Sequence, residues 1–94
     1  MTEDLKTLHF IIKGQIQGVG FRATIKHHAD KMGLTGSVKN LSNGSVEIYI
    51  QGLPEVLDSF SHLLDQGFGP AKIEHVSREG YPNQKVFENF QILF

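Results

Sequence analysis

The sequence predicts an α/β sandwich of the α+β type, in which an antiparallel sheet carries two helices on one face, and three observations support it. Apolar residues alternate with polar ones in several short runs, which is typical of strands with one buried face. Two longer runs carry apolar residues at helical spacing. The runs follow one another in the order β-α-β-β-α-β, with a short terminal strand after them. A length of 94 residues suffices for one core, so residues 1–94 are expected to form a single domain.

The first strand and the first helix flank a glycine-rich segment. Leu8, Phe10 and Ile12 alternate with less apolar neighbours and predict the strand. Apolar residues recur at every third or fourth position over 21–32 and predict the helix. Gly33 suits the end of that helix, because glycine readily adopts the left-handed conformation that follows a last helical turn.

The middle of the chain predicts a hairpin and a second helix. Two strands, over 35–41 and 46–51, flank the dipeptide Asn43-Gly44. Asn-Gly is the strongest short hairpin signal, and it predicts a tight turn in which both residues have positive φ. An apolar stripe over 54–66 predicts the second helix, which Gly67 ends.

Two further strands complete the topology. Residues 71–79 alternate imperfectly, as a bulged strand would, and Phe90, Ile92 and Phe94 alternate at the end of the chain. This order of elements is that of a ferredoxin-like sandwich, in which the third strand lies antiparallel between the first and second and both helices cover one face. The opposite face is expected to meet water. It carries His9, Lys13, Lys39, Glu47 and Gln51.

The composition argues against several classes of function. The chain has no cysteine, which excludes disulfides and thiolate metal sites. Its formal net charge is −1 and it shows no basic stripe, so we expect no nucleic-acid partner. No apolar run is long enough to cross a bilayer, and the acidic and polar segment 1–4 does not suit a signal peptide, so we expect no membrane association. A cytoplasmic location and a monomeric state are the default expectations.

The five histidines do not form a recognisable metal site. His27 and His28 are adjacent on the predicted helix and therefore diverge by about 100°. The other three, which are His9, His62 and His75, show no spacing typical of metal ligands. We therefore expect neither a metal nor a cofactor.

The glycine-rich segment from Gly14 to Arg22 is the strongest functional signal in the chain. A glycine-rich loop directs consecutive N–H groups at one point, and the start of the following helix adds free donors and the positive end of its dipole, so such a loop suits phosphate. A cation at a helix N-terminus is disfavoured by roughly 0.3–1 kcal/mol, so Arg22 is better explained if an anion lies between it and the loop. The loop is neither a dinucleotide fingerprint nor a Walker A loop, because Ala23 replaces the third glycine and no Gly-Lys-Ser/Thr follows. From these residues alone, a tight strand–helix connection is an equally good interpretation.

Asn40 is expected to lie close to this loop in space. It shares the parity of Val38, so its side chain should point to the helix-covered face. The first and second strands of the predicted sheet are two strand spacings apart, roughly 10 Å, which brings a phosphate in the loop near the Asn40 amide. Taken alone, Asn40 is more readily explained as a strand-end or turn residue.

Two segments of the chain resemble the signatures of the acylphosphatase family. The first reads Gly14-x-Ile16-Gln17-Gly18-Val19-x-Phe21-Arg22, and the second reads Gly36-x-Val38-Lys39-Asn40-x-x-x-Gly44-x-Val46, followed after five residues by Gly52. The resemblance covers nearly the whole chain. It implies a ferredoxin-like enzyme that hydrolyses acyl phosphates to a carboxylate and inorganic phosphate without a metal.

The resemblance also implies roles for individual residues. Arg22, with backbone amides of the loop, binds the phosphate, and Asn40 positions the attacking water. The phosphate-binding set is then Gln15, Ile16, Gln17, Gly18, Val19, Gly20 and Arg22. Inorganic phosphate or sulfate is expected to compete with the substrate, because each presents the same tetrahedral oxygens.

The chain departs from the family pattern at two positions. Ser37 stands where the family usually has an aromatic residue, and Ile16 stands where valine is usual. Ser37 has the opposite parity to Asn40, so it should face away from the chemistry. Ile16 adds one methylene and should leave the loop backbone unchanged.

Two other functions remain open from the sequence. Ferredoxin-like domains also bind RNA on the open sheet face, but that face offers Tyr49 without the aromatic run of RNA-binding modules. A regulatory or carbamoyl-phosphate-handling domain of a larger maturation protein can carry a similar signature, although the zinc-binding part of such a protein would need cysteines, which this chain lacks.

Overall fold

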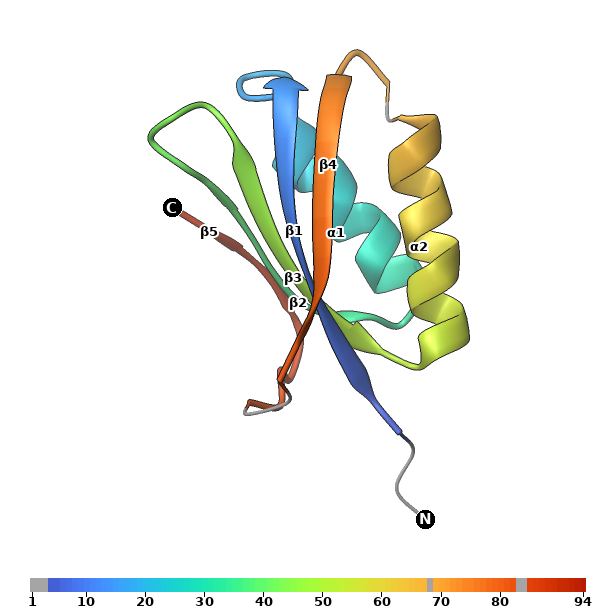
Figure 1. Cartoon of the computed structure of the whole chain (residues 1–94). Helices are drawn as coiled ribbons and strands as arrows, with labels where there is room; N and C mark the ends of the chain where they lie inside the picture. The colour runs from blue at the N-terminus through green and yellow to red at the C-terminus, as the bar shows by residue number, and fades with distance from the viewer. Residues whose placement is uncertain (1–3, 68, 83–84) are drawn as a thin grey trace.

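The helices and strands fall where the sequence predicts them, with boundaries that differ by a few residues at most (Figure 1). The computed structural model describes residues 4–67, 69–82 and 85–94, so residues 1–3 of the polar N-terminal segment 1–4 lie outside it. The elements are β1 (Lys6–Gln15), α1 (Phe21–Lys31), β2 (Thr35–Asn40), β3 (Val46–Gly52), α2 (Pro54–Gln66), β4 (Lys72–Tyr81) and β5 (Phe90–Leu93).

The strands form one sheet in the order β4-β1-β3-β2-β5. β3 lies antiparallel between β1 and β2, as predicted, and β4 pairs antiparallel with the other edge of β1. β5 pairs in parallel with β2, which makes the five-stranded sheet mixed. This direction follows from the topology, because a strand that returns from the end of β4 runs opposite to β4 and therefore alongside β1 and β2. Its C-terminal end consequently lies beside the C-terminal end of β2.

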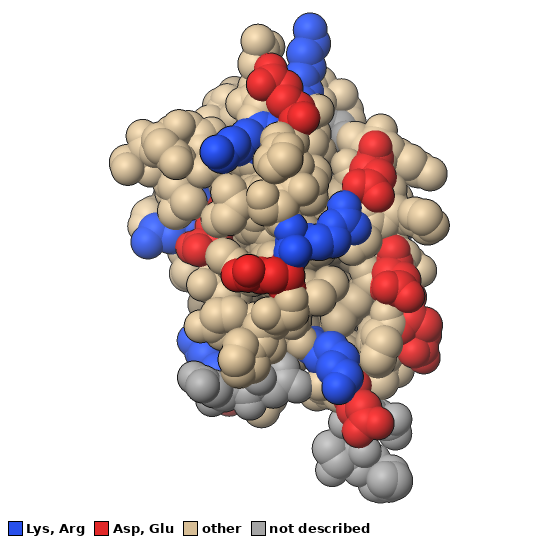
Figure 2. Space-filling model, viewed as in Figure 1, with Lys and Arg blue, Asp and Glu red and all other residues tan. Residues whose placement is uncertain are grey.

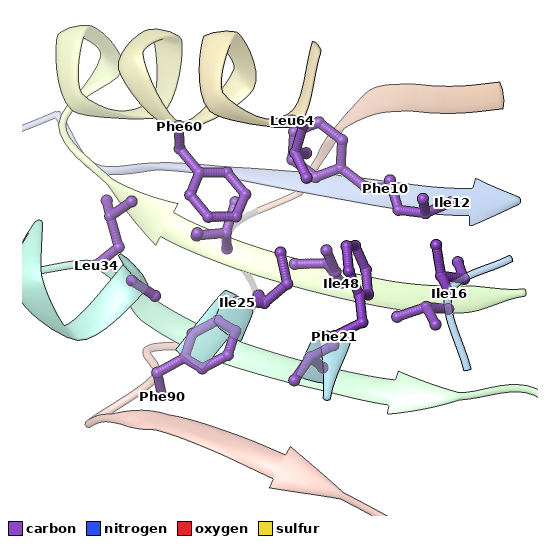
Figure 3. Close-up of a cluster of buried hydrophobic side chains, with 14 of the residues drawn as sticks. Phe10, Ile12, Ile16, Phe21, Ile25, Leu34, Ile48, Phe60, Leu64 and Phe90 are labelled. Carbon is purple, nitrogen blue, oxygen red and sulfur yellow. The ribbon is translucent and has the colours of Figure 1, made fainter. Parts of the chain in front are cut away.

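Both helices cover one face of the sheet, and the core fills the space between them (Figures 1 and 3). The strands supply side chains from alternate positions, as their pattern predicts, and each helix supplies one apolar stripe. The fully or almost fully buried side chains include Phe10, Ile12, Val38, Ile48 and Ile50 from the strands and Phe21, Ile25, Phe60 and Leu64 from the helices. Ile16, which follows β1, belongs to the same cluster and is 1% exposed. The loop after β1 is thereby anchored to the core.

The irregular strand at 71–79 is bulged, as its imperfect alternation predicts. β1 pairs Lys13 with His75 and Gly14 with Ile73, so Glu74 has no partner in the ladder. Gly14 has φ +147°, and a Cβ added there would lie 2.0 Å from the carbonyl oxygen of Lys72. Only glycine allows β4 to approach β1 this closely next to the functional loop.

The β2–β3 hairpin differs from the turn that Asn43-Gly44 predicts. Gly44 has φ +93°, whereas no described residue other than glycine has positive φ, so the expected turn with two positive φ values is wrong. The Gly44 N–H donates to Leu41 O and the Leu41 N–H donates to Ser45 O, which makes a three-residue loop that ends in glycine. Asn43 instead uses its carboxamide oxygen, which accepts hydrogen bonds from the Ser45 N–H and hydroxyl groups.

The sheet face that the helices leave uncovered is only partly exposed to water. Lys13 and Lys39 are exposed as expected, but Gln51 is 3% exposed, so the expectation for Gln51 is wrong. Its Nε2 donates to Lys85 O at 2.9 Å and its Oε1 accepts from the Phe87 N–H at 3.1 Å. The segment before β5 crosses this face to reach the edge of β2, and it covers Gln51 there.

Candidate active site

The loop between β1 and α1 has the backbone geometry that its glycines predict. Gly18 has φ +79° and Gly20 has φ +76°, values at which a side chain would be strained. Gly20 is the residue before α1, and no side-chain hydrogen bond caps this helix within the described part of the chain. The Gly20 carbonyl accepts hydrogen bonds from the Thr24 N–H and hydroxyl groups, both at 3.0 Å. The carbonyl is thus turned into the helix, and the donor end of α1 lies at the loop.

A pocket of about 210 Å³ lies beside this loop, and we name it the Arg22 pocket. Its lining includes Gly18, Gly20, Arg22, Asn40, Ile92 and Phe94. These residues come from the loop and α1, from the end of β2, and from the C-terminal segment. In Figure 1 the loop after β1, the β2–β3 hairpin and the end of β5 lie at the same end of the sheet, which explains why such distant segments meet.

Arg22 contributes a positive charge that no described carboxylate neutralises. It is the second residue of α1 and is half-buried. Its Nη1 donates to the Leu93 carbonyl oxygen at 3.2 Å, and its guanidinium carbon lies 4.9 Å from the centre of the Phe94 ring. Among the described residues, Arg22 forms no ion pair with an Asp or Glu side chain. A half-buried cation held by neutral groups favours an anionic ligand.

Asn40 reaches the same pocket from β2. It pairs with Val46 in the β2–β3 ladder and is half-buried. Its parity is that of Val38, which is 0% exposed beneath the helices, and the side chain accordingly lines the pocket rather than the open face. No hydrogen bond to the Asn40 carboxamide occurs within the ranges that the structure describes. Both its donor and its acceptor therefore remain available to a ligand.

The other residues of the predicted phosphate-binding set divide into two groups. Ile16, Gly18 and Gly20 line the Arg22 pocket together with Arg22. The second group does not line it, and its members are Gln15, Gln17 and Val19. Gln15 is exposed and ends β1, and Val19 is 40% exposed. Gln17 directs its side chain to the β2–β3 hairpin, where Nε2 donates to Leu41 O and Ser45 O. Their proposed backbone roles stay predictions.

Sequence reasoning missed the C-terminal contribution to the pocket. Ile92 and Phe94 line it, and the Leu93 carbonyl holds Arg22. The alternation of residues 90–94 predicts a strand but not its partner. Parallel pairing with β2 places the end of β5 next to Asn40. The sequence does not show that β2 is the partner of β5, so the C-terminal wall of the pocket could not be predicted.

A larger hollow lies elsewhere and has a different character. This Arg78 hollow, about 470 Å³, lies between the end of α2 and β4, and Arg78, Asp65 and His75 are among its lining. Arg78 donates to the Asp65 carboxylate at 2.9 Å, so its charge is matched within the chain. Size alone would select this hollow, but its cation is already paired.

The open sheet face offers little to an RNA base. Tyr49 is stacked on His9 with ring centroids 4.5 Å apart, and Tyr81 meets it edge-on at 5.0 Å. His9 in turn contacts Glu47 at 2.9 Å and Glu79 at 3.5 Å. Burial and the neighbouring Glu47 raise the pKa of the Tyr49 hydroxyl. Figure 2 shows basic and acidic side chains interspersed on the face it presents, without a basic stripe. His9 thus covers one face of Tyr49, and two acidic side chains contact His9.

Two further features of the described residues bear on other partners. No helix in these ranges is long and apolar enough to cross a membrane. Nor do three or more His, Asp or Glu side chains gather in the described ranges as they would around a metal ion.

The fold and the pocket together define a small ferredoxin-like protein with a site suited to a phosphate group. The sequence pattern of the acylphosphatase family matches residues 8–92. The acylphosphatase of Vibrio parahaemolyticus serotype O3:K6 is 44% identical over 90 residues, which cover 96% of this chain and 99% of that one. The crystal structure of acylphosphatase from Bacillus subtilis has a TM-score of 0.89 at 32% identity, and the match covers 95% of this chain and 99% of that one. This chain therefore belongs to the acylphosphatase family.

A further similarity concerns a much larger protein. The crystal structure of T. kodakarensis HypF has a TM-score of 0.82 at 29% identity, with 95% of this chain covering 12% of that one.

The family resemblance, the ferredoxin-like fold and the enzyme class expected from the sequence are confirmed: membership implies a hydrolase of acyl phosphates.

Proposed function

We propose that this chain hydrolyses acyl phosphates by direct attack of water on a phosphoryl group held in the Arg22 pocket. One observation supports the proposal above all others. Arg22 and Asn40 come from different elements and line one pocket of about 210 Å³ with the glycines of the loop. In the part of the chain that the structure describes, Arg22 has no carboxylate partner and the Asn40 carboxamide has no hydrogen bond. The pocket thus collects a charge and a polar group that a ligand can satisfy.

The loop and Arg22 bind the phosphoryl group in this mechanism. Backbone N–H groups from Gln15 to Gly20 and the start of α1 act as fixed donors that need no reorganisation. The Arg22 guanidinium has five N–H donors in a planar fork, and the contact with Leu93 O engages one nitrogen only. The remaining donors can form the paired contacts to phosphate oxygens for which arginine is suited.

Asn40 positions the attacking water. Its carboxamide oxygen accepts a hydrogen bond from the water, and its NH₂ group donates to a phosphate oxygen. The water oxygen forms a bond to phosphorus, the bond between phosphorus and the acyl oxygen breaks, and the carboxylate leaves with the electron pair. The proton from the water passes to the phosphate product. Because the carboxylate is a good leaving group, positioning and charge stabilisation suffice without a strong base or a covalent nucleophile.

Three finer statements belong to the same proposal. Arg22, the loop amides and the dipole of α1 together balance the phosphoryl charge without a metal ion. Inorganic phosphate and sulfate compete for the pocket. The enzyme acts as a monomer, since the mechanism uses Arg22, Asn40 and the loop of a single chain and requires no residue from a second copy. A cytoplasmic location remains a prediction from the sequence.

The test is hydrolysis of benzoyl phosphate by the purified protein, followed continuously, with carbamoyl phosphate as a parallel substrate. We expect turnover of benzoyl phosphate that exhaustive chelation leaves unchanged and that inorganic phosphate inhibits competitively. No turnover would contradict the proposed hydrolysis. Turnover confined to carbamoyl phosphate would favour the carbamoyl-phosphate-handling function. Activity lost with a chelator and restored by a divalent ion would overturn the metal-free mechanism.

A further inference from the structure

The Gln17 side chain connects the two halves of the Arg22 pocket. Gln17 lies in the loop after β1, and its Nε2 donates to Leu41 O at 3.0 Å and to Ser45 O at 2.9 Å. The two acceptors are 24 and 28 positions further along the chain, on the β2–β3 hairpin. One carboxamide NH₂ group thus donates both hydrogens across the gap between the phosphate loop and the hairpin.

Both acceptors lie next to the Asn40–Val46 pair, on the side of the turn. Leu41 follows Asn40 directly, and Ser45 precedes Val46, the residue that pairs with Asn40 in the β2–β3 ladder. The same two carbonyls also close the hairpin, because Leu41 O accepts from the Gly44 N–H and Ser45 O accepts from the Leu41 N–H. Each carbonyl oxygen has two lone pairs, so Gln17 uses the acceptor capacity that the hairpin leaves over. Gln17 is therefore hydrogen-bonded to both strands of the hairpin at the pair of residues next to the one that positions water.

We infer that Gln17 is a positioning residue, which fixes the distance between the phosphate held by the loop and the water held by Asn40. This inference rests on the proposed function. The Gln17 side chain does not line the Arg22 pocket, so it acts on the reaction through Asn40. In-line attack depends on this alignment, because phosphate and water are held by elements that are not adjacent in the sequence. Loop and hairpin could otherwise move independently, since both are surface segments.

Residue type and length explain why glutamine suits this position. Glutamate has the same shape but would present a carboxylate oxygen to two carbonyl oxygens, without a hydrogen to donate. Methionine has a similar length and keeps the Gln17 backbone N–H while removing both side-chain donors. Gln17→Met is accordingly the variant that isolates the connection.

The experiment compares Gln17→Met with wild type in benzoyl phosphate hydrolysis and in inhibition by inorganic phosphate. We expect kcat to fall roughly 10- to 100-fold, as small misplacements of reacting groups do, while the inhibition constant of phosphate stays nearly unchanged. In an Asn40→Ala background the same substitution should change kcat less than about twofold, because the group it positions is already gone. Gln66→Met, at an exposed position on the last turn of α2, is the matched control and should keep full activity.

The outcomes separate this inference from the proposed function. If wild type does not hydrolyse benzoyl phosphate, the proposed function fails. If wild type is active and Gln17→Met retains its kcat, or loses as much in the Asn40→Ala background as in wild type, the positioning role is wrong. If Gln17→Met does not fold, hydrogen exchange of the wild-type Gln17 side-chain NH₂ group decides the question. Exchange slower than that of Gln66 supports the connection, and equal exchange overturns it.

Discussion

Two hollows of this molecule each contain one of its two arginines, and the arginines differ in what they contact. Arg78 donates to Asp65 at 2.9 Å in the Arg78 hollow of about 470 Å³. Arg22 contacts a carbonyl oxygen and an aromatic ring in the Arg22 pocket of about 210 Å³. The smaller pocket keeps its charge available to a ligand, and the larger hollow does not. Charge balance, rather than volume, therefore distinguishes the candidate active site.

The surroundings of the two arginines reinforce the difference. Arg22 lies at the start of a helix, close to two glycines with left-handed φ, and lines the same pocket as Asn40. Arg78 lies on β4, and its ion pair with Asp65 is exposed on both sides, at 39% and 53%. Exposed pairs of this kind contribute about 0–1 kcal/mol to stability. The comparison predicts that equal substitutions at the two arginines have unequal consequences.

The largest expected effect is that of Arg22→Ala. Loss of one preorganised donor typically lowers kcat about 10²–10³-fold, and the loss of a charged fork should reach at least that range. Arg22→Lys should restore little, because a point charge cannot make the paired contact. The matched control is Arg78→Ala, which should retain kcat and KM for benzoyl phosphate. If the two alanine variants lose activity equally, the distinction between the two sites fails.

Asn40→Ala should have the next largest effect, and it should separate binding from chemistry. Its side chain is assigned to water, so kcat should fall strongly while the inhibition constant of inorganic phosphate changes much less. Asn89→Ala changes an exposed asparagine outside the Arg22 pocket and should leave both quantities unchanged. Loss of phosphate binding with kcat preserved would mean that the roles of Arg22 and Asn40 are wrongly assigned.

Alanine substitutions at Gly20 and Gly36 should differ in how much stability they cost. A Cβ added at Gly20 meets no atom within 4 Å, so Gly20→Ala should cost only the left-handed backbone strain of about 1–2 kcal/mol, while activity falls because the loop amides are redirected. A Cβ added at Gly36 would lie 1.9 Å from Tyr49 O, so Gly36→Ala must displace β2 from β3. Thermal unfolding should show the greater loss of stability for Gly36→Ala, and a benzoyl phosphate assay should show the loss of activity in Gly20→Ala. A larger stability loss for Gly20→Ala would contradict this account of the loop.

The smallest expected effect concerns pH and a histidine outside both hollows. Burial lowers the pKa of His28 below its ordinary value of 6.5, and His27 and Lys31 add to the effect. The folded chain therefore binds this proton less readily than the unfolded chain, and its stability falls as the pH falls through 6.5. In His28→Gln this loss should disappear. The Tm of the variant minus that of wild type should therefore increase as the pH falls from about 7.5 to 5. A constant difference in Tm over this range would exclude the contribution of His28.

The sequence predicted much of this molecule because its signals are local. Alternation, helical spacing and the glycines at 18 and 20 gave the elements and the loop, and the order of elements placed β3 between β1 and β2. Two of the errors concern contacts over long sequence distances. Burial of Gln51 depends on the segment at 85–87, and the C-terminal wall of the Arg22 pocket depends on the pairing of β5 with β2.

The hairpin shows that a local signal can fit more than one turn. Asn43-Gly44 does mark the turn, but the dipeptide is compatible both with a two-residue hairpin loop and with a three-residue loop that ends in glycine. The side chain of Asn43 accepts from Ser45, and this contact accompanies the three-residue loop. The same loop presents the two carbonyls that Gln17 contacts, so no local pattern around Gln17 could indicate its partners.

The most direct test of the comparison is a titration of the labelled protein with inorganic phosphate, followed by NMR of backbone amides and arginine side chains. We expect saturable shifts of the Gly18, Val19 and Gly20 amides and of the Arg22 side chain, and we expect the amide shifts to vanish in Arg22→Ala and to persist in Arg78→Ala. Shifts centred on Arg78 and the end of α2, or no saturable shifts at all, would contradict the claim that the unpaired arginine marks the phosphate site.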